Sequence, residues 1–237
     1  MKVGLFVTCI VDQFFPDVAW ATVKVLRKAG VEVCFDSRQT CCGQPAYNSG
    51  FWSEARRVSG NLFPLFPDVD HIVVPSGSCA AMMRNHLSEV HTDSDPGEIQ
   101  KFSRRVVELS EFLVRVCGIE DLSASFRARA AFHDSCHALR DLRVGDAPRK
   151  LLRKVRDLEL VELPGADQCC GFGGLFSVKY PEISASMGSD KLGCLQQSGA
   201  NVLVSADMSC LMHLKGMMQK QKFNLRTMHL AEVLASG

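Results

Sequence analysis

The sequence contains no run of about 18 or more apolar residues, so we expect no helix that spans a membrane. It has no excess of either charge, because 27 basic and 26 acidic residues leave a net charge of +1. Nucleic-acid-binding proteins usually carry a basic excess that meets the phosphates, so no nucleic-acid partner is expected. No G-x-G-x-x-G follows a candidate strand, which disfavours a nicotinamide or flavin dinucleotide site.

A secretory leader is not expected either. The apolar stretch after Lys2 is interrupted by Asp12 and Asp17, and residues 3–7 are more typical of a buried first strand. We therefore expect a cytoplasmic, reducing location. The sequence has 11 cysteines, and in that location many thiols indicate metal or redox chemistry rather than disulfides.

Eight of the cysteines form two sets with matching spacing. In each set a single cysteine is followed, after 31 or 32 residues, by Cys-Cys-Gly and then by a further cysteine. The first set is Cys9, Cys41, Cys42 and Cys79, and the second is Cys136, Cys169, Cys170 and Cys210. This repeat predicts a duplicated chain, with a first half over residues 1–122 and a second half over residues 123–237.

Short apolar runs alternate with helical patterns in both halves. The candidate strands are 3–9, 31–35, 71–75, 129–133, 158–163, 201–205 and 225–229. The candidate helices are 17–29, 98–117 and 181–198. The alternation predicts an α/β fold made of two pseudo-repeated halves, each with a short parallel sheet flanked by helices.

The cysteines of both sets follow candidate strands. Because sites form at the carboxyl ends of parallel strands, we expect the four thiols of each half to gather at one edge of its sheet. Ionising four thiols at pH 7 costs about 8 kcal/mol, which a metal centre can supply. Adjacent cysteines chelate one ion poorly but reach two irons of one cluster. The sequence therefore favours iron–sulfur clusters of the [4Fe-4S] type, one or two per chain, with zinc as the alternative in one or both sites.

Several other residues near the motifs have either a functional or a structural interpretation. Cys34, Cys117 and Cys194 lie outside the repeat and are expected to pack as small apolar side chains. His133 and His137 flank Cys136, and either one binds or tunes the centre or both are structural. The loops 43–52 and 171–178 carry Phe51, Trp52, Phe172 and Phe176, which either form a docking surface for a partner or belong to the core.

The motifs resemble those of a known family. The stretches Cys41-Cys42-Gly43, Pro75-Ser76-Gly77-Ser78-Cys79, His133-Asp134-Ser135-Cys136-His137 and Cys169-Cys170-Gly171-Phe172-Gly173-Gly174 are similar to the duplicated cysteine-rich, or CCG, domain. That domain occurs in heterodisulfide reductase and in the iron–sulfur subunits of glycolate oxidase and anaerobic glycerol-3-phosphate dehydrogenase. The two-repeat form at this length resembles the lactate-utilization protein A family.

The sequence departs from the fullest pattern of these relatives at two positions. In heterodisulfide reductase the motif ends in C-x-x-C, whereas this chain has Ser76 and Asp207 at the first of those positions. Four thiols remain in each half, which suffice for a four-iron cluster but not for a five-thiolate form. Asp207 and His137 are additional candidate ligands.

The resemblance implies an electron-transfer subunit, non-catalytic or co-catalytic, of a cytoplasmic complex that oxidises L-lactate to pyruvate. It also implies two partners, a ferredoxin-like iron–sulfur protein and a third small subunit. Two other functions stay open: a thiol-disulfide oxidoreductase subunit of the heterodisulfide type, and a structural or regulatory protein that holds zinc.

Overall fold

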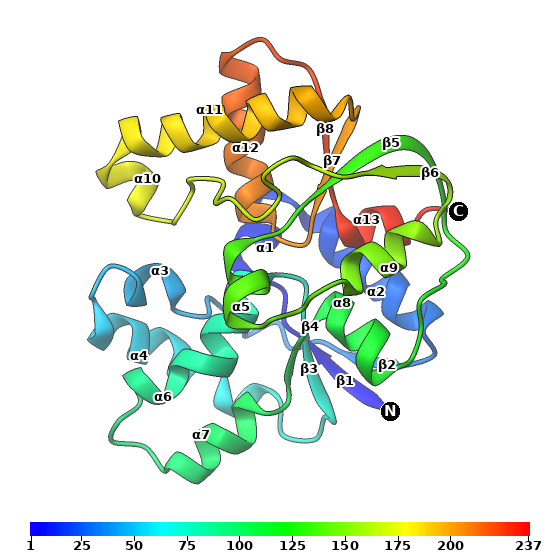
Figure 1. Ribbon diagram of the computed structural model, residues 1–237. Helices are drawn as coiled ribbons and strands as arrows, with labels where there is room; N and C mark the ends of the chain where they lie inside the picture. Colours follow the sequence, from blue (N-terminus) through cyan, green and yellow to red (C-terminus); the bar gives the residue numbers. More distant parts are fainter.

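The computed structural model describes all residues from 1 to 237, and it contains two parallel four-stranded sheets (Figure 1). The first sheet has the order β2-β1-β3-β4, with β1 at Lys2–Leu5, β2 at Glu32–Cys34, β3 at His71–Val74 and β4 at Val106–Glu108. The second repeats it as β6-β5-β7-β8, with β5 at Ser125–His133, β6 at Arg156–Val161, β7 at Val202–Ser205 and β8 at Arg226–His229. The predicted pair of pseudo-repeated α/β halves is confirmed.

Helices flank both sheets. In the first half they are α1 (Cys9–Phe14), α2 (Pro16–Lys28), α3 (Gln44–Tyr47), α4 (Trp52–Gly60), η1 (Phe63–Leu65), α5 (Gly77–Ala81), η2 (Met82–His86), α6 (Leu87–Val90), α7 (Pro96–Ser103), α8 (Leu109–Glu111) and η3 (Phe112–Val116). In the second they are η4 (His137–Asp141), α9 (Ala147–Arg153), α10 (Phe176–Lys179), α11 (Pro181–Ser198), α12 (Met208–Lys220) and α13 (Leu230–Leu234). No helix is both long enough and apolar enough to cross a membrane.

The helix ends follow the local sequence. Helix α11 begins with Pro181, whose fixed φ suits the first turn, and it ends before Gly199, which has a φ of +65°. Helix α2 also begins with a proline, Pro16, and buries the face that carries Val18, Val25 and Leu26. Both helices match their predicted ranges closely.

The predicted helix over residues 98–117 is wrong. The structure has α7, then strand β4, then the helix α8–η3 in this stretch. Val106 is buried within the strand, while Leu109 and Leu113 are buried on the helix after it. Their spacing matches one helical face by coincidence, because a strand of three residues is too short to show its own period. A smaller correction concerns Cys9, which begins α1 instead of closing the first strand.

The two halves interlock. Helix α13 of the second half packs on α2 of the first, and α8 of the first half packs on α9 of the second (Figure 1). The first turn of α5 approaches η4 very closely, since a Cβ on Gly77 would lie 2.7 Å from the Ala138 Cβ and 2.7 Å from the Ser135 Oγ. This packing brings the carboxyl edges of both sheets together.

Candidate metal centre

One cleft between the two halves contains all eight cysteines of the repeat. It has an empty volume of about 790 Å³ and is open to solvent. Its walls carry the thiols Cys9, Cys41, Cys42, Cys79, Cys136, Cys169, Cys170 and Cys210. The sequence predicts a gathering of four thiols in each half, and the structure adds that the two sets face the same space.

The central strands of each sheet place four of these thiols. Cys9 follows β1 and Cys79 lies in the first turn of α5 after β3, and these two strands are neighbours in the first sheet. Cys136 follows β5 and Cys210 lies in the first turn of α12 after β7, which are the matching neighbours in the second. Between two such central strands, the chain connections leave toward opposite sides of the parallel sheet. This opens a crevice at the carboxyl ends of the strands.

A glycine turn positions the adjacent cysteines in each half. Gly43 and Gly171 have φ values of +91° and +89°. Their backbone N–H groups point at the preceding thiols, with 3.4 Å from the Gly43 nitrogen to the Cys41 Sγ and 3.4 Å from the Gly171 nitrogen to the Cys169 Sγ. A Cβ on Gly171 would lie 2.6 Å from the Ser184 carbonyl oxygen, so the turn requires glycine.

Within the first set, the Cys9 and Cys41 Sγ atoms are 3.7 Å apart. Hydrogen bonds from the Cys42 and Cys9 thiols lower the pKa of Cys41 to about 3. The same bond to Cys41, together with burial, raises the pKa of Cys9. The pKa of Cys42 is raised by its hydrogen bonds to Cys41 and Cys79 and by burial. One thiolate, Cys41, thus forms while its neighbours donate to it.

The second set repeats this arrangement. Hydrogen bonds from the Cys136 and Cys170 thiols lower the pKa of Cys169 to about 2. The pKa values of Cys136 and Cys170 are raised, first by their hydrogen bonds to Cys169. The Cys170 Sγ lies 3.0 Å from the Cys210 Sγ. In each set the hydrogen bonds favour the thiolate form of one cysteine and the thiol form of its neighbours, which a metal would have to deprotonate.

The three cysteines outside the repeat do not line the cleft. Cys34 ends strand β2, Cys117 follows η3, and Cys194 lies within α11. All three are half-buried. Cys117 and Cys194 pack against the larger hydrophobic core, as expected from the sequence, whereas Cys34 belongs to neither hydrophobic cluster.

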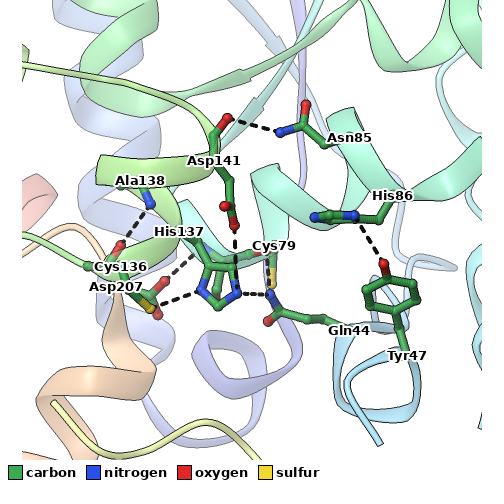
Figure 2. A network of polar contacts seen from close by, with 12 residues as sticks. Gln44, Tyr47, Cys79, Asn85, His86, Cys136, His137, Ala138, Asp141 and Asp207 are labelled. Atoms are coloured by element: carbon green, nitrogen blue, oxygen red, sulfur yellow. Dashed lines mark hydrogen bonds and ion pairs between the residues drawn. The ribbon is translucent and has the colours of Figure 1, made fainter. Parts of the chain in front are cut away.

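His137 lies at the cleft wall, and both of its ring nitrogens have partners (Figure 2). Its Nδ1 is 3.4 Å from the Cys136 Sγ, and its Nε2 is 3.1 Å from the Gln44 Nε2 and 4.0 Å from an Asp141 carboxylate oxygen. Gln44 belongs to the first half and also donates to the Ser78 carbonyl oxygen at 3.0 Å. His137 therefore links the halves beside Cys136.

Asp207 is buried at the cleft wall, and hydrogen bonds engage both of its carboxylate oxygens. Its Oδ2 accepts from the Ser78 backbone at 2.9 Å and from the Ser76 hydroxyl at 3.2 Å, both in the first half. Its Oδ1 accepts from the Ser209 hydroxyl at 2.6 Å. The two positions that depart from the C-x-x-C pattern are thus bonded to each other across the cleft.

Two buried polar residues, His133 and Lys191, lie next to the second set of cysteines. His133 is fully buried, and neither ring nitrogen has a hydrogen-bond partner. Its neighbours are the Cys170 and Cys210 thiols, with all three ligand atoms within 4.8 Å of one another. Leaving a buried polar group unpaired costs about 1–3 kcal/mol, so an imidazole here fits a centre that it contacts.

The Lys191 ammonium is buried as well, and the cysteine pattern of the sequence does not point to it. It donates to the Gly165 carbonyl oxygen at 2.5 Å and to the Ala166 carbonyl oxygen, and no carboxylate pairs with it. Burial lowers the pKa of Lys191, and the nearby Cys194 and Cys170 act in the opposite direction. The helical spacing of Lys191 with Gly188 and Leu195 on the buried face of α11 was the signal that could have identified it.

The chemistry of the donor set fits an anionic metal group. Eight thiols line the cleft, backbone N–H groups at two glycine turns donate to two of them, and a buried ammonium lies near Cys170, whereas the one carboxylate among the lining residues, Asp207, is already hydrogen-bonded. Soft thiolate ligands select zinc and iron–sulfur clusters over hard cations such as magnesium. The residues present therefore fit either group.

The aromatic loops near the cleft differ in exposure. Phe51 and Trp52 are 52% and 53% exposed at the start of α4. Phe172 lines the cleft and is half-buried, as is Phe176. The Lys179 ammonium of α10 in the second half lies 5.9 Å from the centre of the Phe51 ring, so the end of α10 lies close to the start of α4.

Comparison with known proteins identifies the family of this chain. The model of the cysteine-rich CCG domain matches the chain twice, over residues 3–84 and 130–215. Lactate utilization protein A of Geobacillus kaustophilus (strain HTA426) is 46% identical over 235 residues, which cover 99% of this chain and 98% of that protein. This chain belongs to the lactate utilization protein A family. Family membership supports a role in lactate utilization.

Other family members agree. Lactate utilization protein A of Bacillus subtilis (strain 168) is 44% identical over 237 residues and covers all of both chains. Among solved structures, a glutamate racemase from Bacillus anthracis overlaps at a TM-score of 0.35 with 12% identity, covering 99% of this chain and 78% of that one. That overlap is too slight to indicate a shared fold.

Proposed function

We propose that this chain is an iron–sulfur electron-transfer subunit of a cytoplasmic complex that oxidises L-lactate to pyruvate. The observation that carries the proposal is the single open cleft lined by two complete sets of four cysteines. The proposed ligands are Cys9, Cys41, Cys42 and Cys79 for one centre and Cys136, Cys169, Cys170 and Cys210 for the other. A [4Fe-4S] cluster at such a site would accept and release single electrons.

The chain's own residues would prepare the site for an anionic group. The Gly43 and Gly171 backbone N–H groups point at thiolates, and hydrogen bonds to cluster sulfur and ligand sulfur tune reduction potential. The Lys191 ammonium adds a fixed positive charge beside the second set. Asp207 and His137 would hold the two halves, and hence the two sets of ligands, at a fixed separation.

The proposed partners are a ferredoxin-like iron–sulfur protein and a third small subunit. The exposed rings of Phe51 and Trp52 beside the cleft suit a surface that a partner covers, because aromatic side chains are enriched at interfaces. Electron transfer also needs the partner close to the cleft. The division of the chain into two CCG halves, residues 1–122 and 123–237, is part of the same proposal.

The test is anaerobic co-expression of this chain with both companions, followed by measurement of lactate oxidation with an artificial electron acceptor. We expect L-lactate to bleach the iron–sulfur absorbance of this chain in the complex. The isolated chain should not respond to lactate. Bleaching that is unchanged when Cys42 and Cys170 are both replaced by serine would contradict the proposal.

A thiol-disulfide oxidoreductase is a second candidate. The observation in its favour is the pair of half-buried thiols Cys41 and Cys169, whose pKa values are lowered to about 3 and about 2. Thiolates are the nucleophiles of disulfide exchange. Turnover of a disulfide substrate by the chain, alone or in the complex, would favour this function, and bound zinc without iron would favour the structural alternative.

A further inference from the structure

The two sets of ligands have different surroundings, and the difference lies at the end of the first strand of each half. His133 stands three residues before Cys136, and Phe6 stands three residues before Cys9. Both side chains are completely buried. The fold therefore accepts an apolar ring at this position, and packing alone does not require histidine.

The imidazole of His133 has nothing in the chain to bond to. Nδ1 and Nε2 are both buried without a hydrogen-bond partner, whereas His137 and His229 have partners for their ring nitrogens. A neutral imidazole carries one N–H donor and one lone pair, so both are unused.

The free ring faces two thiols of the second set. The ligand atoms of His133, Cys170 and Cys210 all lie within 4.8 Å of one another, and all three side chains are buried. A neutral imidazole and thiolates together are common ligands of zinc and of some iron–sulfur centres. The phenyl ring of Phe6 offers no ligand atom to the first set.

We propose that His133 supplies an imidazole nitrogen to the metal centre of the second half, beside the thiolates of Cys170 and Cys210. The two centres of the chain then differ: sulfur alone holds the first, and sulfur with nitrogen holds the second. This inference rests on the proposed metal-binding function.

The experiment compares three full-length variants with the wild-type chain, all purified anaerobically. His133→Phe copies the first half, so it fills the space and removes the nitrogen. His133→Cys replaces the nitrogen by a thiol. His137→Gln is the matched control, because His137 also neighbours Cys136 but already has partners for both nitrogens. Iron, sulfide and zinc are counted per chain, and pulsed electron paramagnetic resonance of the reduced protein measures coupling to ¹⁴N.

We expect the wild type to show a ¹⁴N coupling that changes to ¹⁵N when the histidines are labelled. His133→Phe should lose that coupling but keep the metal, because the four thiols of the second half remain. His133→Cys should retain the metal without the coupling, and His137→Gln should keep the coupling. Iron clusters without nitrogen coupling in the wild type, or a coupling that survives in His133→Phe, would overturn the inference.

The same measurements separate this inference from the proposed function. Zinc without iron in the wild type would contradict the electron-transfer function, and a zinc X-ray absorption spectrum that loses a nitrogen ligand in His133→Phe would still support the inference. A zinc spectrum that is the same in the wild type and in His133→Phe would overturn it. A wild-type chain that binds no metal at all under these conditions overturns both.

Discussion

The backbone N–H of Ser78 donates to the Oδ2 atom of Asp207 over 2.9 Å, and this bond joins the two halves at the wall of the cleft. Asp207 is only 1% exposed and also accepts from the Ser76 hydroxyl. Ser76 and Asp207 occupy matching positions in the two repeats. The departure from cysteine at these positions therefore coincides with a contact that fixes how the halves face each other.

Replacing Asp207 tests whether it holds the halves together or binds metal. Asp207→Ala should lower the free energy of unfolding of the metal-free chain by about 3 kcal/mol, because it leaves buried donors unpaired. Urea titration followed by circular dichroism measures this. In the folded variant Asp207→Asn, metal content should equal that of the wild type. Loss of metal from Asp207→Asn would identify Asp207 as a ligand instead.

The glycine turn after the second cysteine pair should tolerate no side chain. Gly171→Ala forces alanine to a φ of +89° and its Cβ to 2.6 Å from the Ser184 carbonyl oxygen. We expect a loss of about 2 kcal/mol or more in the free energy of unfolding. Gly193→Ala is the control, because that glycine lies within α11 with no atom near its Cβ position, and it should be neutral or stabilising. Equal effects of the two substitutions would contradict this account.

Glu108 should make stability depend on pH. Its carboxyl is fully buried, its Oε1 has no partner, and burial raises its pKa from 4.5 to about 7. The folded chain therefore holds a proton that the unfolded chain releases, so stability falls as pH rises from about 4.5 to about 7. The contribution is about 1.4 kcal/mol per pH unit in this window, or about 3 kcal/mol in total.

Glu108→Gln isolates that contribution. The amide oxygen still accepts the hydrogen bonds from the Ser110 and Glu111 backbone that cap α8. Urea unfolding of both proteins at several pH values should show the variant gaining stability relative to the wild type up to about pH 7 and then a constant difference. A difference that does not change with pH would show that Glu108 keeps an ordinary pKa.

The exposed aromatic pair beside the cleft should matter for docking and not for folding. Trp52→Glu should leave the free energy of unfolding within about 0.5 kcal/mol of the wild type. It should weaken binding of the ferredoxin-like companion about tenfold or more, because tryptophan dominates many interfaces. Trp20→Glu is the matched control, since Trp20 is 67% exposed on α2, which contributes no residue to the cleft, whereas Trp52 closely follows Pro45 and Asn48, which line it. Surface plasmon resonance measures how tightly each variant binds the companion. Unchanged binding in Trp52→Glu would exclude this surface as the docking site.

Sequence spacing predicted much of this arrangement, because matching intervals between cysteines imply matching turns after matching strands. It placed Cys79, Cys136 and Cys210 beyond strand ends and took Cys9 as the last residue of its strand, and the structure confirms two similar α/β halves. The missed strand β4 also had a signal in the repeat. Glu108-Leu109-Ser110-Glu111 matches His229-Leu230-Ala231-Glu232, and in both places the first residue ends a strand and caps a helix.

The common cleft could not be predicted in this way. It depends on how the halves pack, which is set by contacts distant in sequence: α13 on α2, and the close approach at Gly77. No local pattern shows that Asp207 would bond to Ser78, 129 residues away. Likewise, the sequence does not show that the ring nitrogens of His133 lack hydrogen-bond partners, because this depends on the positions of all surrounding groups.

The most direct test of the central claim is a count of iron, acid-labile sulfide and zinc in the anaerobically purified chain and in cysteine variants. The wild type should contain iron and sulfide with broad visible absorbance. Cys42→Ser and Cys170→Ser should each lose one centre, because the four thiols of the other half remain complete, whereas Cys117→Ala and Cys194→Ala should keep the full content. Loss of all metal in a single variant would show one centre shared by the eight cysteines. Zinc alone, or full iron in both serine variants, would contradict the assignment of this cleft as an iron–sulfur site.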